Sequence, residues 1–242
     1  MNMKRNKWRM ILDIARTELQ TLFYSPIAWL TLIIFVVQAS MTFSSVFGTY
    51  VERFNLGYRP VNLTQGIFSG FRGLYTSILP YLFYYFPLLT MGLMSRELSS
   101  GSVKLLYSSP VNNIQIILGK FVSMMIYALV FVGILLVFIS FGACTIDHFD
   151  FWLTVSGLLG VYLLICSYAA IGLFMSSLTS YQIVAALGTL SILFVLNMVG
   201  GLWQDIEWVR DITWWLSISG RANEFISGLI CSCLLYTSDA AD

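Results

Sequence analysis

The chain alternates long apolar runs with short clusters of charged residues. About 20 helical residues cross the ~30 Å of hydrocarbon in a bilayer. Five runs reach that length, and none of them contains Asp, Glu, Lys, Arg or His: residues 27–47, 74–94, 121–142, 153–175 and 183–202. The pattern predicts an all-α fold, a polytopic integral membrane helical bundle with five spans.

After the external segment, a helix leading back through the membrane is expected to follow Gly228. Residues 229–235 start an apolar run, but it is too short to cross a bilayer before the polar ending of residues 236–242. We therefore expect a truncated sixth span followed by a non-native tail at 229–242.

Residues 1–26 have the spacing of an amphipathic helix. Apolar residues from Trp8 to Phe23 recur at helical intervals, with charged residues between them, and Ser25-Pro26 ends the pattern. Such a helix lies along a membrane interface, where it either anchors the first span or takes an active part. Residues 203–226, rich in Trp and acidic residues, predict a second interfacial helix on the opposite face, best explained as an aromatic belt.

The composition agrees with a membrane protein and excludes a soluble domain. Apolar residues make up 58% of the chain and charged residues 10%, and the mean hydropathy is +0.80. A soluble domain carries about 25% charged residues. The net charge of +1 gives no reason to expect nucleic acid as a partner.

The distribution of Lys and Arg predicts the orientation. If the N-terminus is cytoplasmic, eight basic residues lie inside: Lys4, Arg5, Lys7, Arg9, Arg16, Arg96, Lys104 and Lys120. Only five lie outside: Arg53, Arg59, Arg72, Arg210 and Arg221. Since positive residues favour the cytoplasmic side, the N-terminus is expected there.

The sequence shows no means of powering transport by itself. It contains no G-x-x-x-x-G-K-[ST] phosphate-binding loop, and its single His148 lies beside acidic residues in a short loop, which is better explained as a solvated turn than as a metal site. A proton- or ion-coupled carrier usually keeps an ionisable residue at membrane depth, and the spans hold none. Any transport should therefore draw on a partner, and we expect no catalytic, cofactor-binding or metal-ligating residue in this chain.

Residues 96–110, after the second span, form the most distinctive polar segment. Gly101 should end the helix leaving the span, Ser102 can cap a short helix to Tyr107, and Pro110 should end that helix. A short rigid helix with an apolar edge can dock in a groove on a soluble partner, although an ordinary connecting loop explains the spacing equally well.

Several motifs together resemble a known family over roughly residues 10–230. They are A-R-x-E-L at 15–19, S-P at 25–26, E-x-x-x-G-S-x-x-x-L-x-x-x-P at 97–110, L-G-K-F at 118–121 and G-L-F-x-S-S-L-T at 172–179. The chain resembles the permease subunit of type-two ABC exporters, most closely the gliding-motility-associated (GldF-type) permeases of Bacteroidetes.

The resemblance implies a six-span permease of the bacterial cytoplasmic (inner) membrane that pairs with a second permease half, identical or different. Two ABC ATPase subunits would bind below and supply ATP and Mg²⁺, and export would be coupled to hydrolysis, with gliding motility as a possible role. The resemblance assigns the ATPase-coupling contact to these residues: Glu97, Gly101, Ser102, Leu105, Leu106, Pro110, Arg16 and Glu18.

The second span is expected to face the transport pathway in such permeases. Pro80 and Pro87 lie two turns apart, so their kinks should share a face, with the hydroxyls of Tyr81, Tyr84 and Tyr85 beside them. Packing or lipid contact remains the simpler explanation for any single tyrosine. The main alternative function is a non-transporting membrane scaffold of an envelope or motility assembly.

Overall fold

A computed structural model describes residues 2–57, 63–102, 112–146, 149–199 and 226. Within these ranges the chain is built of helices and contains no strand. The external helix expected at 203–226, apart from Ile226, and the truncated span expected at 229–242 lie outside the described residues. His148 and the whole of residues 103–110 lie outside them as well.

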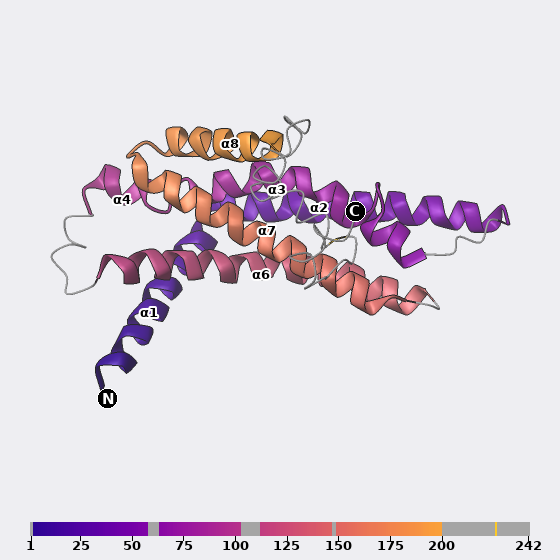
Figure 1. Ribbon diagram of the computed structural model, residues 1–242, viewed down its shortest axis with the longest axis horizontal. Coiled ribbons are helices and arrows are strands. Elements are labelled where there is room, and N and C mark those ends of the chain that lie inside the picture. The colour runs from indigo at the N-terminus through magenta and orange to yellow at the C-terminus, as the bar shows by residue number, and fades with distance from the viewer. Residues whose placement is uncertain (1, 58–62, 103–111, 147–148, 200–225, 227–242) are drawn as a thin grey trace, which may run out of the picture.

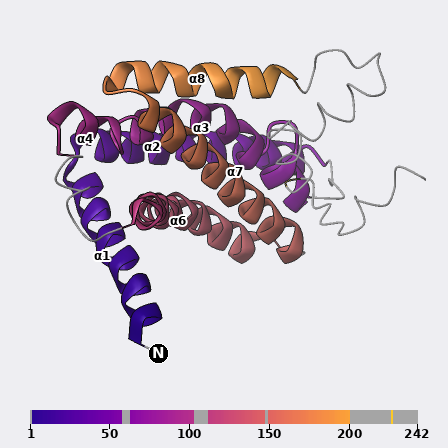
Figure 2. The same ribbon diagram turned by 60° about the vertical axis from the view of Figure 1, so that its left-hand side comes forward.

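The helices form an elongated bundle (Figure 1). They are α1 (Asn2–Tyr24), α2 (Pro26–Asn55), the short π-helix η1 (Gln65–Ser69), α3 (Leu74–Thr90), α4 (Ser95–Ser100), α6 (Asn113–Thr145), α7 (Phe151–Leu178) and α8 (Gln182–Val199). Helices α8 and α6 lie on opposite sides of the α2–α3 pair (Figure 2). Helices α2, α6 and α7, together with α3–α4 taken with η1, are long and apolar enough to cross a membrane, whereas α8 is shorter over its described residues.

Several helices extend past the apolar runs that predicted them. Helix α2 continues through Glu52 and Arg53, and α6 begins well before residue 121 and so includes Lys120. Backbone hydrogen bonding does not stop where the hydrocarbon ends, so a helix can carry its polar ends beyond the span. Helix α3, in contrast, ends at Thr90, and residues 91–94 form a turn before α4.

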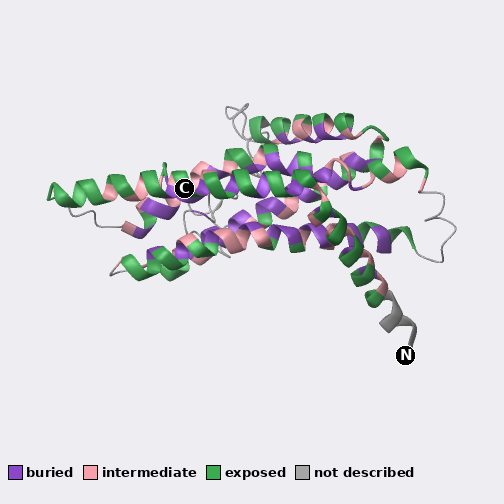
Figure 3. Cartoon of the chain, turned by 180° about the vertical axis from the view of Figure 1, so that it is seen from behind, coloured by how far each residue is buried: buried purple, intermediate pink, exposed green. Residues whose placement is uncertain are grey.

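The core is largely aliphatic, and aromatic side chains on the inward faces of α2, α3 and α6 pack together within it. Phe35 contacts both Phe131 and Tyr85 edge-on, with ring centroids 4.7 Å and 6.4 Å apart. Tyr127 donates a hydrogen bond of 2.8 Å to the backbone carbonyl of Ala28. Exposed positions run along the outer faces of these helices (Figure 3). Many of them are large apolar residues, as expected where lipid replaces water as the solvent.

Helix α1 leaves the bundle at an angle and packs against α6 (Figures 1 and 2). Its buried positions are Ile11, Ala15 and Leu22, which share one face, while Trp8 and Leu12 are exposed. Gly119 on α6 permits the close approach, because a Cβ there would lie only 2.7 Å from Cγ2 of Ile14. Ser25 is extended, so α1 ends before the Ser25-Pro26 pair, as the sequence predicted, and Pro26 is the first residue of α2.

Candidate functional site

Lys120 of α6 lies at the junction of α1, α4 and α6 and is almost completely buried, with 1% of its side chain exposed. Its ammonium group donates to Oε1 of Glu18 on α1 and, over 2.7 Å, to Oε1 of Glu97 on α4. A third hydrogen bond of 2.6 Å reaches the backbone carbonyl of Leu93. One side chain therefore joins three helices and the turn of residues 91–94, which we call the α3–α4 turn.

The surroundings explain why this lysine needs partners. Its neighbours along the same face of α6, Ile116, Ser123 and Met124, are all buried. A charge removed from water costs several kcal/mol unless opposite charge and hydrogen bonds compensate it. Glu18 and Glu97 provide that compensation, and all three donor positions of the ammonium group are used.

The three ionised groups together carry one negative charge, because two carboxylates face one ammonium. The second oxygen of Glu97, Oε2, is buried and has no hydrogen-bond partner. The junction therefore combines a few strong polar contacts, with one acceptor unused, with the apolar packing of α1 on α6. A small displacement of α4 would change the environment of every member.

Ser176 on α7 holds the α3–α4 turn from the other side. Its Oγ accepts hydrogen bonds from the backbone N–H groups of Met94 (3.0 Å) and Ser95 (3.1 Å), and donates to the carbonyl of Met91 (2.9 Å). One turn earlier on the same face, a Cβ at Gly172 would lie 2.1 Å from Oγ1 of Thr90. The small residues of the 172–179 motif thus bring α7 against the end of α3.

Gly101 ends α4 in the left-handed conformation, with φ +70°, and its N–H bonds the carbonyl of Leu98. The end of α4 at Gly101 agrees with the helix end expected there. A left-handed glycine is a common way for a helix to end. Ser102 follows, and its hydroxyl lies 2.8 Å from that of Ser100. Leu105, Leu106 and Pro110 fall outside the described residues.

The structure brings together some of the residues that the sequence assigned to ATPase coupling. Glu18 and Glu97 meet at Lys120, whereas Arg16 is exposed on α1 and takes no part in an ion pair within the described ranges. Lys120 was missed as a site residue. The L-G-K-F motif at 118–121 could have indicated it, because there a lysine follows a glycine at the edge of an otherwise apolar helix.

The tyrosines suggested for the pathway do not share one environment. Tyr81 and Tyr84 are exposed, by 38% and 57%, whereas Tyr85 is buried and contacts Phe35. Pro80 is exposed and Pro87 is buried, although both lie inside α3. In the described ranges, no cluster of three or more His, Cys, Asp or Glu side chains is placed to hold a metal ion.

A family model described as "ABC-2 family transporter protein" matches residues 12–206, most of the chain. The chain belongs to the ABC-2 transporter family. The matched region of this ABC-2 permease includes α1 from Leu12 onward, the Lys120 junction and the 172–179 motif. Neither the curated proteins nor the solved structures contain a significant match to it.

Family membership identifies the chain as a transmembrane permease component of an ABC transporter and a multi-pass membrane protein. Permeases of this family are transport subunits and are generally not catalytic themselves. The family generally implies an ABC ATPase as the partner that hydrolyses ATP.

Proposed function

We propose that this ABC-2 permease is the membrane half of an ATP-driven exporter, and that movement of its ATPase enters through α4 and the Lys120 junction. The observation that carries the proposal is the ion-pair network of Lys120 with Glu18 and Glu97, which ties α4 to α1 and α6. Because Glu97 belongs to residues 96–110, the segment that we expect to dock on the ATPase, a displacement of this segment acts directly on Glu97.

Two rigid connections would carry that displacement into the spans. Through Lys120, α4 acts on α6 and α1, and through Ser176 the α3–α4 turn acts on α7. A buried ion pair cannot be lengthened gradually, because separating its charges in a nonpolar environment costs several kcal/mol. Such a network therefore favours a switch between two arrangements of the helices.

We further propose that α1 and α4 lie at the cytoplasmic face of the bacterial inner membrane. Helix α1, α4 and the start of α6 occupy one end of the bundle (Figure 1), and Arg9, Arg16, Arg96 and Lys120 belong to that end. The bias of basic residues toward the cytoplasm supports this orientation. A second permease half, identical or different, would complete the pathway.

A role in gliding motility is the more specific proposal. Its support is the overall resemblance of the chain to gliding-motility-associated permeases, to which the motifs at 97–110 and 172–179 contribute. Deletion of the gene in a gliding host, followed by measurement of cell spreading and single-cell movement, tests it. Normal gliding by the deletion strain would count against this role while leaving the transport proposal intact.

The coupling proposal is tested with the permease and its cognate ABC ATPase reconstituted in liposomes. Glu97→Gln should leave membrane insertion and complex formation intact but lower permease-dependent ATP hydrolysis about fivefold or more, the range expected for coupled sites. Asp13→Asn is the matched control, because Asp13 is an exposed carboxylate on α1 that makes no described ion pair. Unchanged ATP hydrolysis with the Glu97→Gln variant would reject the coupling route. If the wild-type chain bound no ABC ATPase, the alternative function of a non-transporting membrane scaffold would be favoured.

A further inference from the structure

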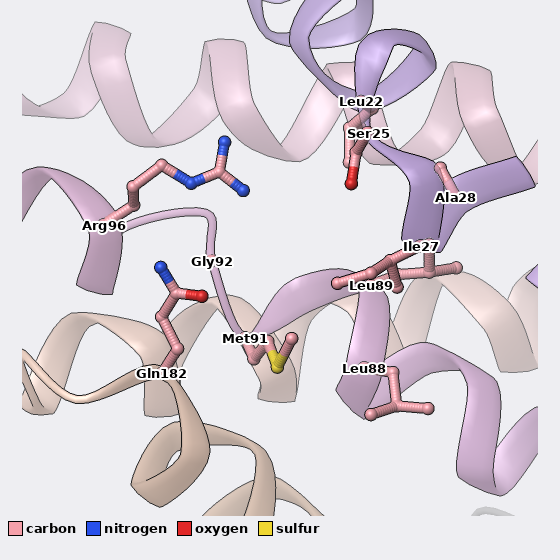
Figure 4. Close-up of a pocket in the computed structure, with 10 residues that line it drawn as sticks. All are labelled: Leu22, Ser25, Ile27, Ala28, Leu88, Leu89, Met91, Gly92, Arg96 and Gln182. Atoms are coloured by element: carbon pink, nitrogen blue, oxygen red, sulfur yellow. The ribbon is translucent and has the colours of Figure 1, made fainter. Parts of the chain in front are cut away.

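A small, partly open hollow lies beside the α3–α4 turn, where the corner between α1 and α2 meets the start of α8 (Figure 4). Three polar side chains from different elements project toward its opening: Ser25, Arg96 and Gln182. Leu22, Leu88 and Leu89 form part of its apolar wall. A second hollow adjoins it and shares Ser25 and Arg96.

Arg96 is the only basic side chain among the residues that line either hollow, and it is exposed. No carboxylate of the described part of the chain lies within ion-pair distance of it. The neighbouring Glu97 is directed to Lys120 instead. Gly92 leaves room for the guanidinium, since a Cβ at that position would lie 3.0 Å from Nη2 of Arg96.

The hollow opens beside an apolar surface. Ile27 is 39% exposed and Leu88 43%, and both line the hollow. Ser25 separates α1 from the first residues of α2, a helix long and apolar enough to cross the membrane. An interfacial helix joined to a span meets it at the depth of the lipid headgroups.

We propose that this hollow binds the phosphate of an anionic membrane phospholipid, with Arg96 supplying the positive charge and Ser25 and Gln182 supplying hydrogen bonds. A guanidinium binds phosphate through two parallel N–H groups, and basic pockets between membrane helices are suited to lipid headgroups. The exposed apolar residues beside the hollow provide a surface for the acyl chains. Glu18 lines the adjoining hollow, and its ion pair with Lys120 offsets part of its negative charge.

Lipid binding to the purified full-length chain can be measured by native mass spectrometry in detergent, and the result does not depend on transport. The probes are phosphatidylglycerol, phosphatidylcholine with the same acyl chains, and inorganic phosphate. Wild-type protein should retain phosphatidylglycerol in preference to the other two. Arg96→Gln should bind it about tenfold more weakly, the loss expected when a charge-assisted hydrogen bond is removed.

Arg9→Gln is the matched control, because it removes one exposed charge from α1 away from the hollow, and its lipid binding should equal that of the wild type. Gln182→Ala is a second variant and should weaken binding to a smaller extent. Equal retention of phosphatidylglycerol by Arg96→Gln and wild type would overturn the proposal. Retention of inorganic phosphate as strong as that of the lipid would also overturn it, by assigning the hollow to a free anion.

Discussion

Lys120 and Glu97 form an ion pair across two helices, with 2.7 Å between Nζ of the lysine and Oε1 of the glutamate. Lys120 is buried, while Glu97 keeps 24% of its side chain exposed at the edge of the same junction. Glu97 thus connects the short polar helix α4 to the interior of the helical bundle. This geometry is the basis of the proposed coupling route and of the first prediction.

Replacing Lys120 with Met should destabilise the permease by about 3–5 kcal/mol, because Glu18 and Glu97 would face each other without their cation. The measurement is the thermal unfolding midpoint of the purified chain in detergent. The triple variant Lys120→Met, Glu18→Gln, Glu97→Gln should recover most of the loss, since no unpaired charge remains. A single Lys120→Met variant as stable as the wild type would show that the network contributes nothing to the fold.

Replacing Ser176 with Ala should destabilise the α3–α4 turn by about 1–3 kcal/mol, because the N–H groups of Met94 and Ser95 would lose their acceptor in a buried position. Ser177→Ala is the matched control, since Ser177 is exposed and its hydroxyl bonds only the carbonyl of Phe174 one turn back. Hydrogen exchange of residues 91–95 reports the local effect. Equal protection in both variants would contradict the role assigned to Ser176.

Replacing Gly172 with Ala should separate α7 from α3, because the new Cβ would lie 2.1 Å from Oγ1 and 2.6 Å from Cβ of Thr90. A loss of about 1–3 kcal/mol is expected, as for other overpacked sites. Gly133→Ala on α6 meets no atom within 4 Å and should be neutral or slightly stabilising. Unfolding midpoints of the two purified variants decide the matter, and an equal change in both would rule out close packing at Gly172.

Replacing Gly101 with Val should strain the end of α4 by about 1–2 kcal/mol, because a Cβ disfavours the left-handed conformation at φ +70°. No atom of a neighbouring described residue lies within 4 Å, so the strain arises from the local backbone conformation and not from packing against other residues. Gly101→Asn should retain more activity, since Asn tolerates this conformation best after Gly. ATP hydrolysis by the reconstituted complex is the readout, and equal activity of Val and Asn variants would argue against a required helix end.

Some features of the site were predictable because they depend on local chemistry. Ser25-Pro26 ends one helix and opens the next, and Gly101 ends α4, since proline and glycine limit the backbone wherever they occur. The roles expected for Leu105, Leu106 and Pro110 stay predictions, as do the pathway tyrosines, the second permease half and the external helix. The break at residues 91–94 contains Gly92, but a single glycine inside a continuous apolar run does not by itself mark the end of a helix, so this break was not predicted.

The sequence by itself determined that this is an all-α membrane protein, because charge-free runs of hydrocarbon length leave no other stable arrangement. Only the tertiary structure decided which faces of those helices meet. Helix α7 is apolar around most of its circumference, so its pattern could not indicate that Gly172 and Ser176 face α3. Likewise, Glu18 and Lys120 are distant in the chain, and their pairing depends on how α1 crosses α6 at Gly119.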